Sequence, residues 1–66
     1  MKFHKELELA PLRTNVIYVT NKGEWFTGFA RGSVQANTWK VVSVIGAAQF
    51  HAHELQAWAV PPEVKL

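Results

Sequence analysis

Two histidines separated by one residue are the side chains of this sequence best suited to bind a metal ion or a polar ligand. On a strand, His51 and His53 would point to the same face and could share a metal ion with His4 or Glu54. His53 could instead make polar contacts to a ligand, or both could be ordinary surface or core histidines. Two spaced histidines do not define a metal site, so we predict no metal and no other cofactor.

The sequence contains no motif that is typical of a catalytic site. Ser33 and Ser43 lack the sharp turn and the oriented acid that activate a serine nucleophile. The five acidic residues are all glutamate, and the absence of aspartate removes many acid/base and Mg²⁺ arrangements. We therefore predict a binding protein and not an enzyme.

Trp39 has a side chain suited to stacking on a nucleobase. It follows the small polar stretch 32–37 and begins a β-branched run, so its ring could lie at the rim of the fold. The alternative is a tryptophan of the core. Lys22, Arg31 and Lys40 could form a basic lip through cross-strand proximity, although scattered, solvated charges are the commoner case.

The composition favours one small domain that associates with copies of itself. A chain of 66 residues buries only roughly 60% of its unfolded surface on folding, and without cysteine it has no disulfide to compensate. Apolar residues make up 48% of the chain, which is a larger share than a single small core can bury. The excess therefore indicates an interface with another molecule. The net charge of +2 permits a nucleic-acid partner without requiring one.

The apolar pattern predicts a mostly β fold. β-Branched and aromatic runs are separated by turn residues, including Asn21 and Gly23, and Gly28 is placed to bend a strand. The predicted strands are residues 16–20, 24–31, 38–45, 49–53 and 55–60. Together they predict a five-stranded, SH3-like or OB-like small barrel.

The whole chain, residues 1–66, is predicted to be this single domain. Residues 1–11 form an N-terminal segment that fits either a short helix or an extended strand and ends at Pro11. The barrel occupies residues 12–60. Pro61 and Pro62 then end the sheet, and residues 61–66 form a C-terminal tail.

Three stretches carry a family resemblance: residues 16–23 (VIYVTNKG), 25–28 (WFTG) and 49–53 (QFHAH), followed by a valine–proline ending. They resemble the Sm-like family, and specifically its bacterial Hfq-like members, which begin their barrel with a similar hairpin. Those members also carry a lysine–histidine pair before the last strand. The likeness spans residues 12–61, but Ala52 stands in place of the lysine and the loop at 32–37 is longer.

The resemblance implies an SH3-like (Sm-like) barrel that binds single-stranded RNA. It also implies a homo-oligomeric ring, closed by pairing the fourth strand of one subunit with the fifth strand of the next. Trp39 falls where the family has the aromatic that stacks on a base, and His53 matches its pore-side histidine. The predicted RNA-binding residues are Arg31, Asn37, Thr38, Trp39, Lys40 and His53.

A protein-interaction module is the alternative to RNA binding. Such a module, of a phage or mobile-element type, would bind a host protein through exposed aromatic side chains. No run approaches the roughly 20 apolar residues of a membrane-spanning helix, and the N-terminus is too polar for a secretory signal. We therefore expect a cytoplasmic protein with no membrane partner.

Overall fold

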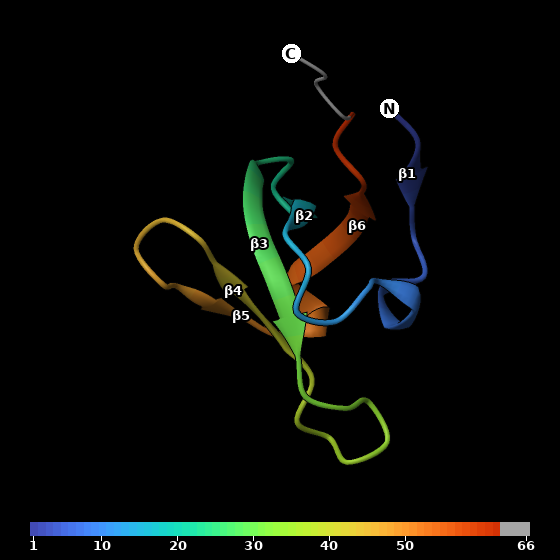
Figure 1. The fold of residues 1–66 in the computed structure, drawn as a ribbon, viewed down its shortest axis with the longest axis vertical. Coiled ribbons are helices and arrows are strands. Elements are labelled where there is room, and N and C mark those ends of the chain that lie inside the picture. Colours follow the sequence, from blue (N-terminus) through green and yellow to red (C-terminus); the bar gives the residue numbers. More distant parts are fainter. Residues whose placement is uncertain (63–66) are drawn as a thin grey trace.

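A single antiparallel β-sheet of six strands, in the order β1-β6-β2-β3-β4-β5, forms the fold (Figure 1). The computed structural model describes residues 1–62. Its strands are β1 (Phe3–His4), β2 (Val16–Thr20), β3 (Trp25–Arg31), β4 (Lys40–Ser43), β5 (Gln49–Phe50) and β6 (Leu55–Ala59). Two short 3₁₀ helices, η1 (Leu7–Leu9) and η2 (Ala52–Glu54), complete the fold. The prediction of a small, mostly β domain is therefore confirmed.

The β2–β3 hairpin is the part of the fold that local sequence determines most directly. Gly23 adopts a φ of +85° in the turn, a conformation that favours glycine. The Thr20 hydroxyl accepts hydrogen bonds from the backbone N–H groups of Lys22 (3.3 Å) and Glu24 (3.1 Å). These contacts set a register in which Tyr18 lies opposite Phe26 and Val19 opposite Trp25.

The strand register sorts side chains onto two faces of the sheet. One lateral row crosses four strands and contains His4, Trp58, Tyr18 and Phe26. Tyr18 in this row is fully buried, so the row belongs to the core face. The next row, Phe3, Ala59, Ile17 and Thr27, must then point to the opposite face.

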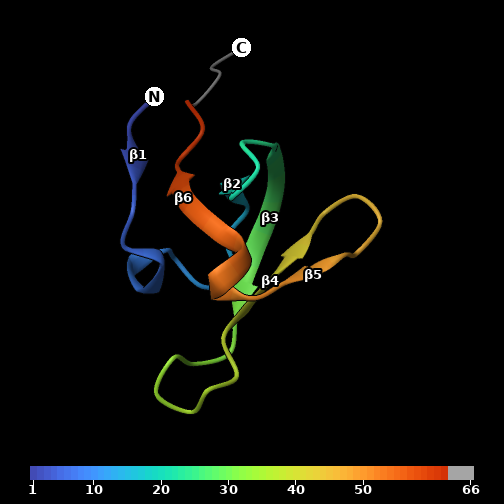
Figure 2. The ribbon, with the colours of Figure 1, turned by 180° about the vertical axis from the view of Figure 1, so that it is seen from behind.

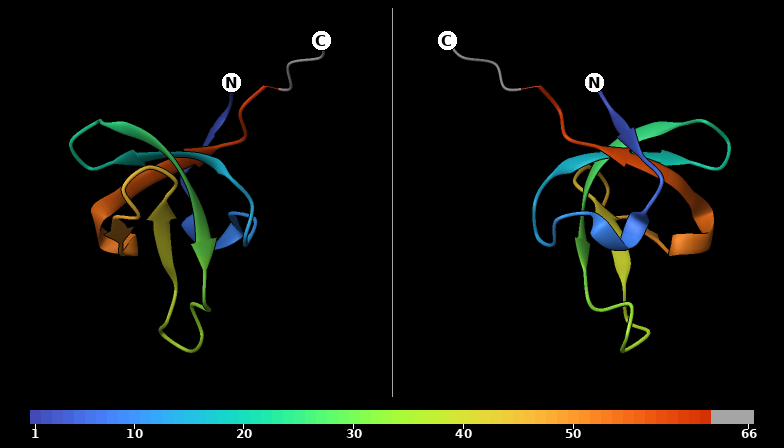
Figure 3. Two further views of the ribbon diagram at one scale, coloured as in Figure 1. Left: turned by 60° about the vertical axis from the view of Figure 1, so that its left-hand side comes forward. Right: turned by 90° about the vertical axis from the view of Figure 1, so that its right-hand side faces the viewer.

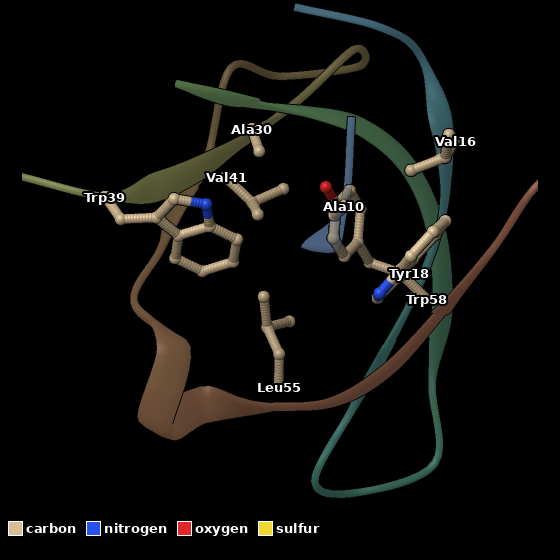
Figure 4. Close-up of a cluster of buried hydrophobic side chains, with 8 residues drawn as sticks. All are labelled: Ala10, Val16, Tyr18, Ala30, Trp39, Val41, Leu55 and Trp58. Carbon is tan, nitrogen blue, oxygen red and sulfur yellow. The ribbon is translucent and has the colours of Figure 1, made fainter. Parts of the chain in front are cut away.

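The core lies inside the curve of the sheet. Seen from behind and from the side, β2, β3 and β6 bend around a common interior, and η1 lies against one side of it (Figures 2 and 3). Figure 4 shows the core side chains directed into this space from strands and connecting segments. They are Ala10, Val16, Tyr18, Ala30, Trp39, Val41, Leu55 and Trp58.

The sheet has six strands and is open, which corrects the prediction of a five-stranded closed barrel. The N-terminal segment contributes both a two-residue strand, β1, and the 3₁₀ helix η1, where the sequence fitted either a helix or a strand. β1 pairs with β6, with Phe3 opposite Ala59. The two ends of the sheet are thus β1 and β5, which are not paired with each other.

The third and fourth predicted strands, residues 38–45 and 49–53, are shorter in the structure than the apolar pattern suggested. β4 ends at Ser43 because its hydroxyl donates to the Ile45 carbonyl (2.8 Å) and accepts from the Ala48 N–H (2.9 Å), which closes a turn. β5 ends at Phe50 because residues 52–54 form η2. The Glu54 carboxylate accepts the His51 N–H (3.0 Å) and so stabilises the start of that helix.

One further sequence-based prediction concerns membranes. Among residues 1–62, the structure contains no helix that is both long enough and apolar enough to cross a bilayer. The predicted C-terminal tail is described only at Pro61 and Pro62; its remaining residues lie outside the described part of the chain.

Candidate functional site

The structure divides the six predicted RNA-binding residues between two surface hollows. Arg31, Thr38 and Lys40 line one of about 620 Å³. Asn37, Trp39 and His53 line a second of about 470 Å³. We name the first the basic hollow; Arg13, Phe29 and Gly32 complete its lining.

Two cations of the basic hollow are direct cross-strand neighbours. Arg31, the last residue of β3, lies opposite Lys40, the first residue of β4. The Lys40 ammonium lies 3.4 Å from the side-chain oxygen of Gln49, which is a neutral partner. Like charges directly opposite each other destabilise a sheet by roughly 0.2–1 kcal/mol. Arg31 and Lys40 therefore repel each other, and a bound anion would reduce this repulsion.

Arg13 brings a third cation to the same place and was not among the predicted site residues. Its backbone N–H donates to the Ala30 carbonyl (2.8 Å), and Leu12 forms an isolated parallel bridge with Ala30. These contacts hold the segment after Pro11 beside β3. Arg13 itself adopts a φ of +57°. The sequence carries no local signal for this position, because it depends on a contact between distant segments.

Phe29 supplies an aromatic ring to the basic hollow. It is half-buried, lies opposite Val42, and precedes Arg31 by two residues on β3. Residues two apart on a strand share a face, so the Phe29 ring lies on the same face as the Arg31 side chain. This alternation is visible in the sequence, but Phe29 was not among the predicted RNA-binding residues.

Gly32 allows the two ends of the loop after β3 to approach each other closely at this hollow. Its φ is +86°, and a Cβ there would collide with the Thr38 carbonyl group. The close approach lets the Thr38 hydroxyl accept the Ser33 N–H (3.0 Å). Thr38 is thereby held in the lining of the basic hollow by a loop contact and not by a strand.

Trp39 lies in the hydrophobic core, which was the alternative considered for it. Only 8% of the residue is exposed, and its ring points inward beside Val41 and Leu55 (Figure 4). The indole N–H is buried and has no hydrogen-bond partner within the part of the chain that the structure describes. In this conformation Trp39 contributes an edge to the second hollow and does not present a free face on which a base could stack.

His53 and His51 lie at the same hollow, although neither is on a strand. Their rings are parallel, with centroids 5.8 Å apart, and both residues are exposed. The His53 carbonyl accepts the Asn21 side-chain N–H (2.6 Å). His4 lies elsewhere, stacked on Trp58 at 4.5 Å. Within residues 1–62, no three metal-ligating side chains are grouped so that they could hold an ion.

Comparison of the chain with protein-family models, with curated proteins and with solved structures gives no match. The class of protein is therefore defined by fold and surface: a small antiparallel β domain with a cationic hollow at one end of its β3–β4 pair. Among residues 1–62, the lining of that hollow includes three cations and no acidic side chain. Such an arrangement can bind an anion electrostatically.

Proposed function

We propose that this chain is an RNA-binding module of the Sm-like type that holds the phosphates of a single strand in the basic hollow. One observation carries the proposal. Arg13, Arg31 and Lys40 come from three separate segments and line one hollow, whose lining in the described part of the chain contains no acidic side chain. The like-charge pair Arg31–Lys40 lowers the stability of the fold, but it favours the binding of an anionic partner.

The Phe29 ring favours a nucleic acid over a simple anion. Proteins that bind single strands combine a positively charged groove with aromatic side chains, since every base offers a face for stacking. Phe29 shares the hollow with the three cations. The proposed RNA-binding site therefore excludes the buried Trp39. It retains three of the residues predicted from the sequence, Arg31, Thr38 and Lys40.

The experiment compares salt dependence in matched double variants. For Arg31→Ala/Lys40→Ala, the plot of log K against log salt should become shallower by about 0.7 for each phosphate that the variant no longer neutralises. Lys2→Ala/Lys5→Ala removes the same charge outside the basic hollow and should leave the slope close to wild type. Equal effects of the two double variants would indicate diffuse charge attraction. Failure of the wild type to bind single-stranded RNA at low salt would refute the function.

We also propose self-association, the second part of the Sm-like prediction. In the family, the fourth and fifth strands of neighbouring subunits pair; here these positions correspond to β5 and β6. The outer edge of β6 is occupied by β1, which is only two residues long, so ring closure in this manner requires β1 to leave β6. Light scattering should give a mass above that of the monomer, and a stable monomer at micromolar concentration would remove the ring.

Binding to a host protein is the second candidate function, and a specific surface feature favours it. Phe3 and Trp25 are 39% and 59% exposed, and their rings meet edge to face at a centroid distance of 5.1 Å. Exposed aromatic side chains of this kind are enriched at protein interfaces. If this function is correct, capture of a partner should survive nuclease treatment and disappear in Trp25→Ala.

A further inference from the structure

A stack of three aromatic rings runs from the core to the surface and ends at Phe50. The Tyr18 and Phe26 rings lie with centroids 5.8 Å apart and an interplanar angle of 25°. The Phe26 and Phe50 rings follow at 4.6 Å and 24°. Tyr18 is fully buried, whereas Phe26 and Phe50 are half-buried. Phe50 is thus the outermost ring of a stack that begins in the core.

Phe50 lines a hollow of about 310 Å³, which we name the Phe50 hollow. Its other lining residues are polar or charged: Thr20, Asn21, Lys22, Glu24, His53 and Glu54. This volume is at the lower end of the range for small-molecule sites, so it suits a single planar group.

The walls of the Phe50 hollow are tied together across the fold. The backbone N–H of Asn21 donates to the Glu54 carbonyl (3.0 Å), and the Asn21 side chain donates to the His53 carbonyl (2.6 Å). The Gln56 side chain donates to the Thr20 carbonyl (2.8 Å). These bonds fasten the β2–β3 turn to η2 and the start of β6, so the hollow is formed before any ligand binds.

We propose that the Phe50 hollow receives one nucleobase of the bound strand, stacked on the Phe50 ring. This inference rests on the proposed RNA-binding function and specifies how a base is recognised. Aromatic side chains stack favourably on any base, and offset ring arrangements of this kind are favoured. Because Phe50 and Phe26 already stack, a base on Phe50 extends an existing arrangement of parallel rings.

The charges of the Phe50 hollow indicate which part of a nucleotide enters it. The two carboxylates, Glu24 and Glu54, outnumber the single ammonium of Lys22 in this lining and so disfavour a phosphate. They can accept hydrogen bonds from exocyclic amino groups. Adenine, cytosine and guanine carry such a group, and uracil does not. The Phe50 hollow should therefore discriminate against uracil.

The edge strand β5 connects this hollow to the basic hollow. Gln49 and Phe50 are successive residues, so their side chains point to opposite faces of the strand. The Gln49 side chain reaches Lys40, whereas the Phe50 ring reaches Phe26. A single strand that crosses the β5 edge can therefore place a phosphate near Lys40 and a base on Phe50.

The test uses single-stranded oligonucleotides that contain a fluorescent adenine analogue, whose emission is quenched when it stacks. Phe50→Leu keeps an apolar side chain but removes the ring, and should weaken binding by about 5- to 150-fold and abolish the quenching. Ile45→Ala is the control, because it removes an exposed apolar side chain outside the Phe50 hollow and the basic hollow and should bind like wild type. Circular dichroism establishes that each variant is folded.

A second measurement does not depend on any variant. Adenosine monophosphate added to the wild-type protein should show upfield shifts of its base protons, caused by the ring current of Phe50, and oligo-A should compete better than oligo-U.

Phe50→Leu with wild-type affinity and quenching would overturn the stacking proposal while RNA binding stands. Equal competition by oligo-U would overturn the base preference. Absence of salt-dependent binding in every protein would instead refute the RNA-binding function itself.

Discussion

Replacement of Tyr18 by phenylalanine should stabilise the protein near neutral pH. The Tyr18 side chain is fully buried in the core (Figure 4), and its hydroxyl has no hydrogen-bond partner among residues 1–62. A buried polar group without a partner costs about 1–3 kcal/mol, and the phenylalanine ring fills nearly the same space. We expect Tyr18→Phe to raise the free energy of unfolding by about 1 kcal/mol, which corresponds to roughly 4–8 °C in Tm for a domain of this size.

The same residue should make the wild type sensitive to alkaline pH. Burial raises the pKa of Tyr18 from its ordinary value of 10.0 to about 12. The unfolded chain loses this proton above pH 10, whereas the folded protein holds it until about pH 12. The ionisation of Tyr18 therefore leaves the free energy of unfolding unchanged below pH 10 and lowers it as pH rises from 10 to 12, by about 3 kcal/mol in total.

Urea unfolding at several pH values, followed by tryptophan fluorescence, measures both effects. Tyr18 is the only tyrosine of the chain, so Tyr18→Phe is a complete control for the titration of lysines in the same pH range. The wild-type and variant curves should diverge above pH 10. Curves that stay parallel up to pH 12, or a variant less stable than wild type by more than about 1 kcal/mol at neutral pH, would show that the hydroxyl has a partner.

Three further substitutions test the assignment of core, loop and surface. Trp39→Ala should lower the free energy of unfolding by about 3–5 kcal/mol, because the residue is buried; a folded variant that loses only RNA binding would instead support a stacking role. Gly32→Ala should destabilise the protein more than Gly23→Ala in thermal unfolding, since both glycines have φ near +85° but only a Cβ at Gly32 meets backbone atoms. Arg13→Gly should increase stability by up to about 1 kcal/mol by removing a strained φ, yet weaken RNA binding; a decrease in stability would contradict the strain argument.

The sequence predicted the β2–β3 hairpin well because local interactions define it. The β-branched run of β2 and the turn at Gly23 need no distant partner to be recognised. The ends of β4 and β5 were wrong because side-chain hydrogen bonds of Ser43 and Glu54 stop the strands, and an apolar pattern does not reveal such bonds.

The candidate site was predicted in part, for a related reason. Arg31 and Lys40 were identified as charged residues, but their direct pairing depends on the register of β3 and β4. Arg13 joins them only through its contact with Ala30. Trp39 was ambiguous because a tryptophan beside a polar loop fits the rim and the core equally well, and only the path of the loop after Gly32 decides between them.

Two departures from local backbone and charge preferences lie at the basic hollow. Arg13 lines it and has a positive φ, and Arg31 faces Lys40 across the strand pair. Each of these features disfavours the folded state by a fraction of a kcal/mol to about 2 kcal/mol. In most of the chain, local preference and tertiary structure agree, as they do in the β2–β3 hairpin. Positive φ values also occur at Asn37 and Ala47, outside this hollow, so backbone strain alone does not mark it. The coincidence of the strained Arg13 with the Arg31–Lys40 pair argues for function there more strongly than any single cation does, because natural sequences usually retain such conflicts where they serve binding.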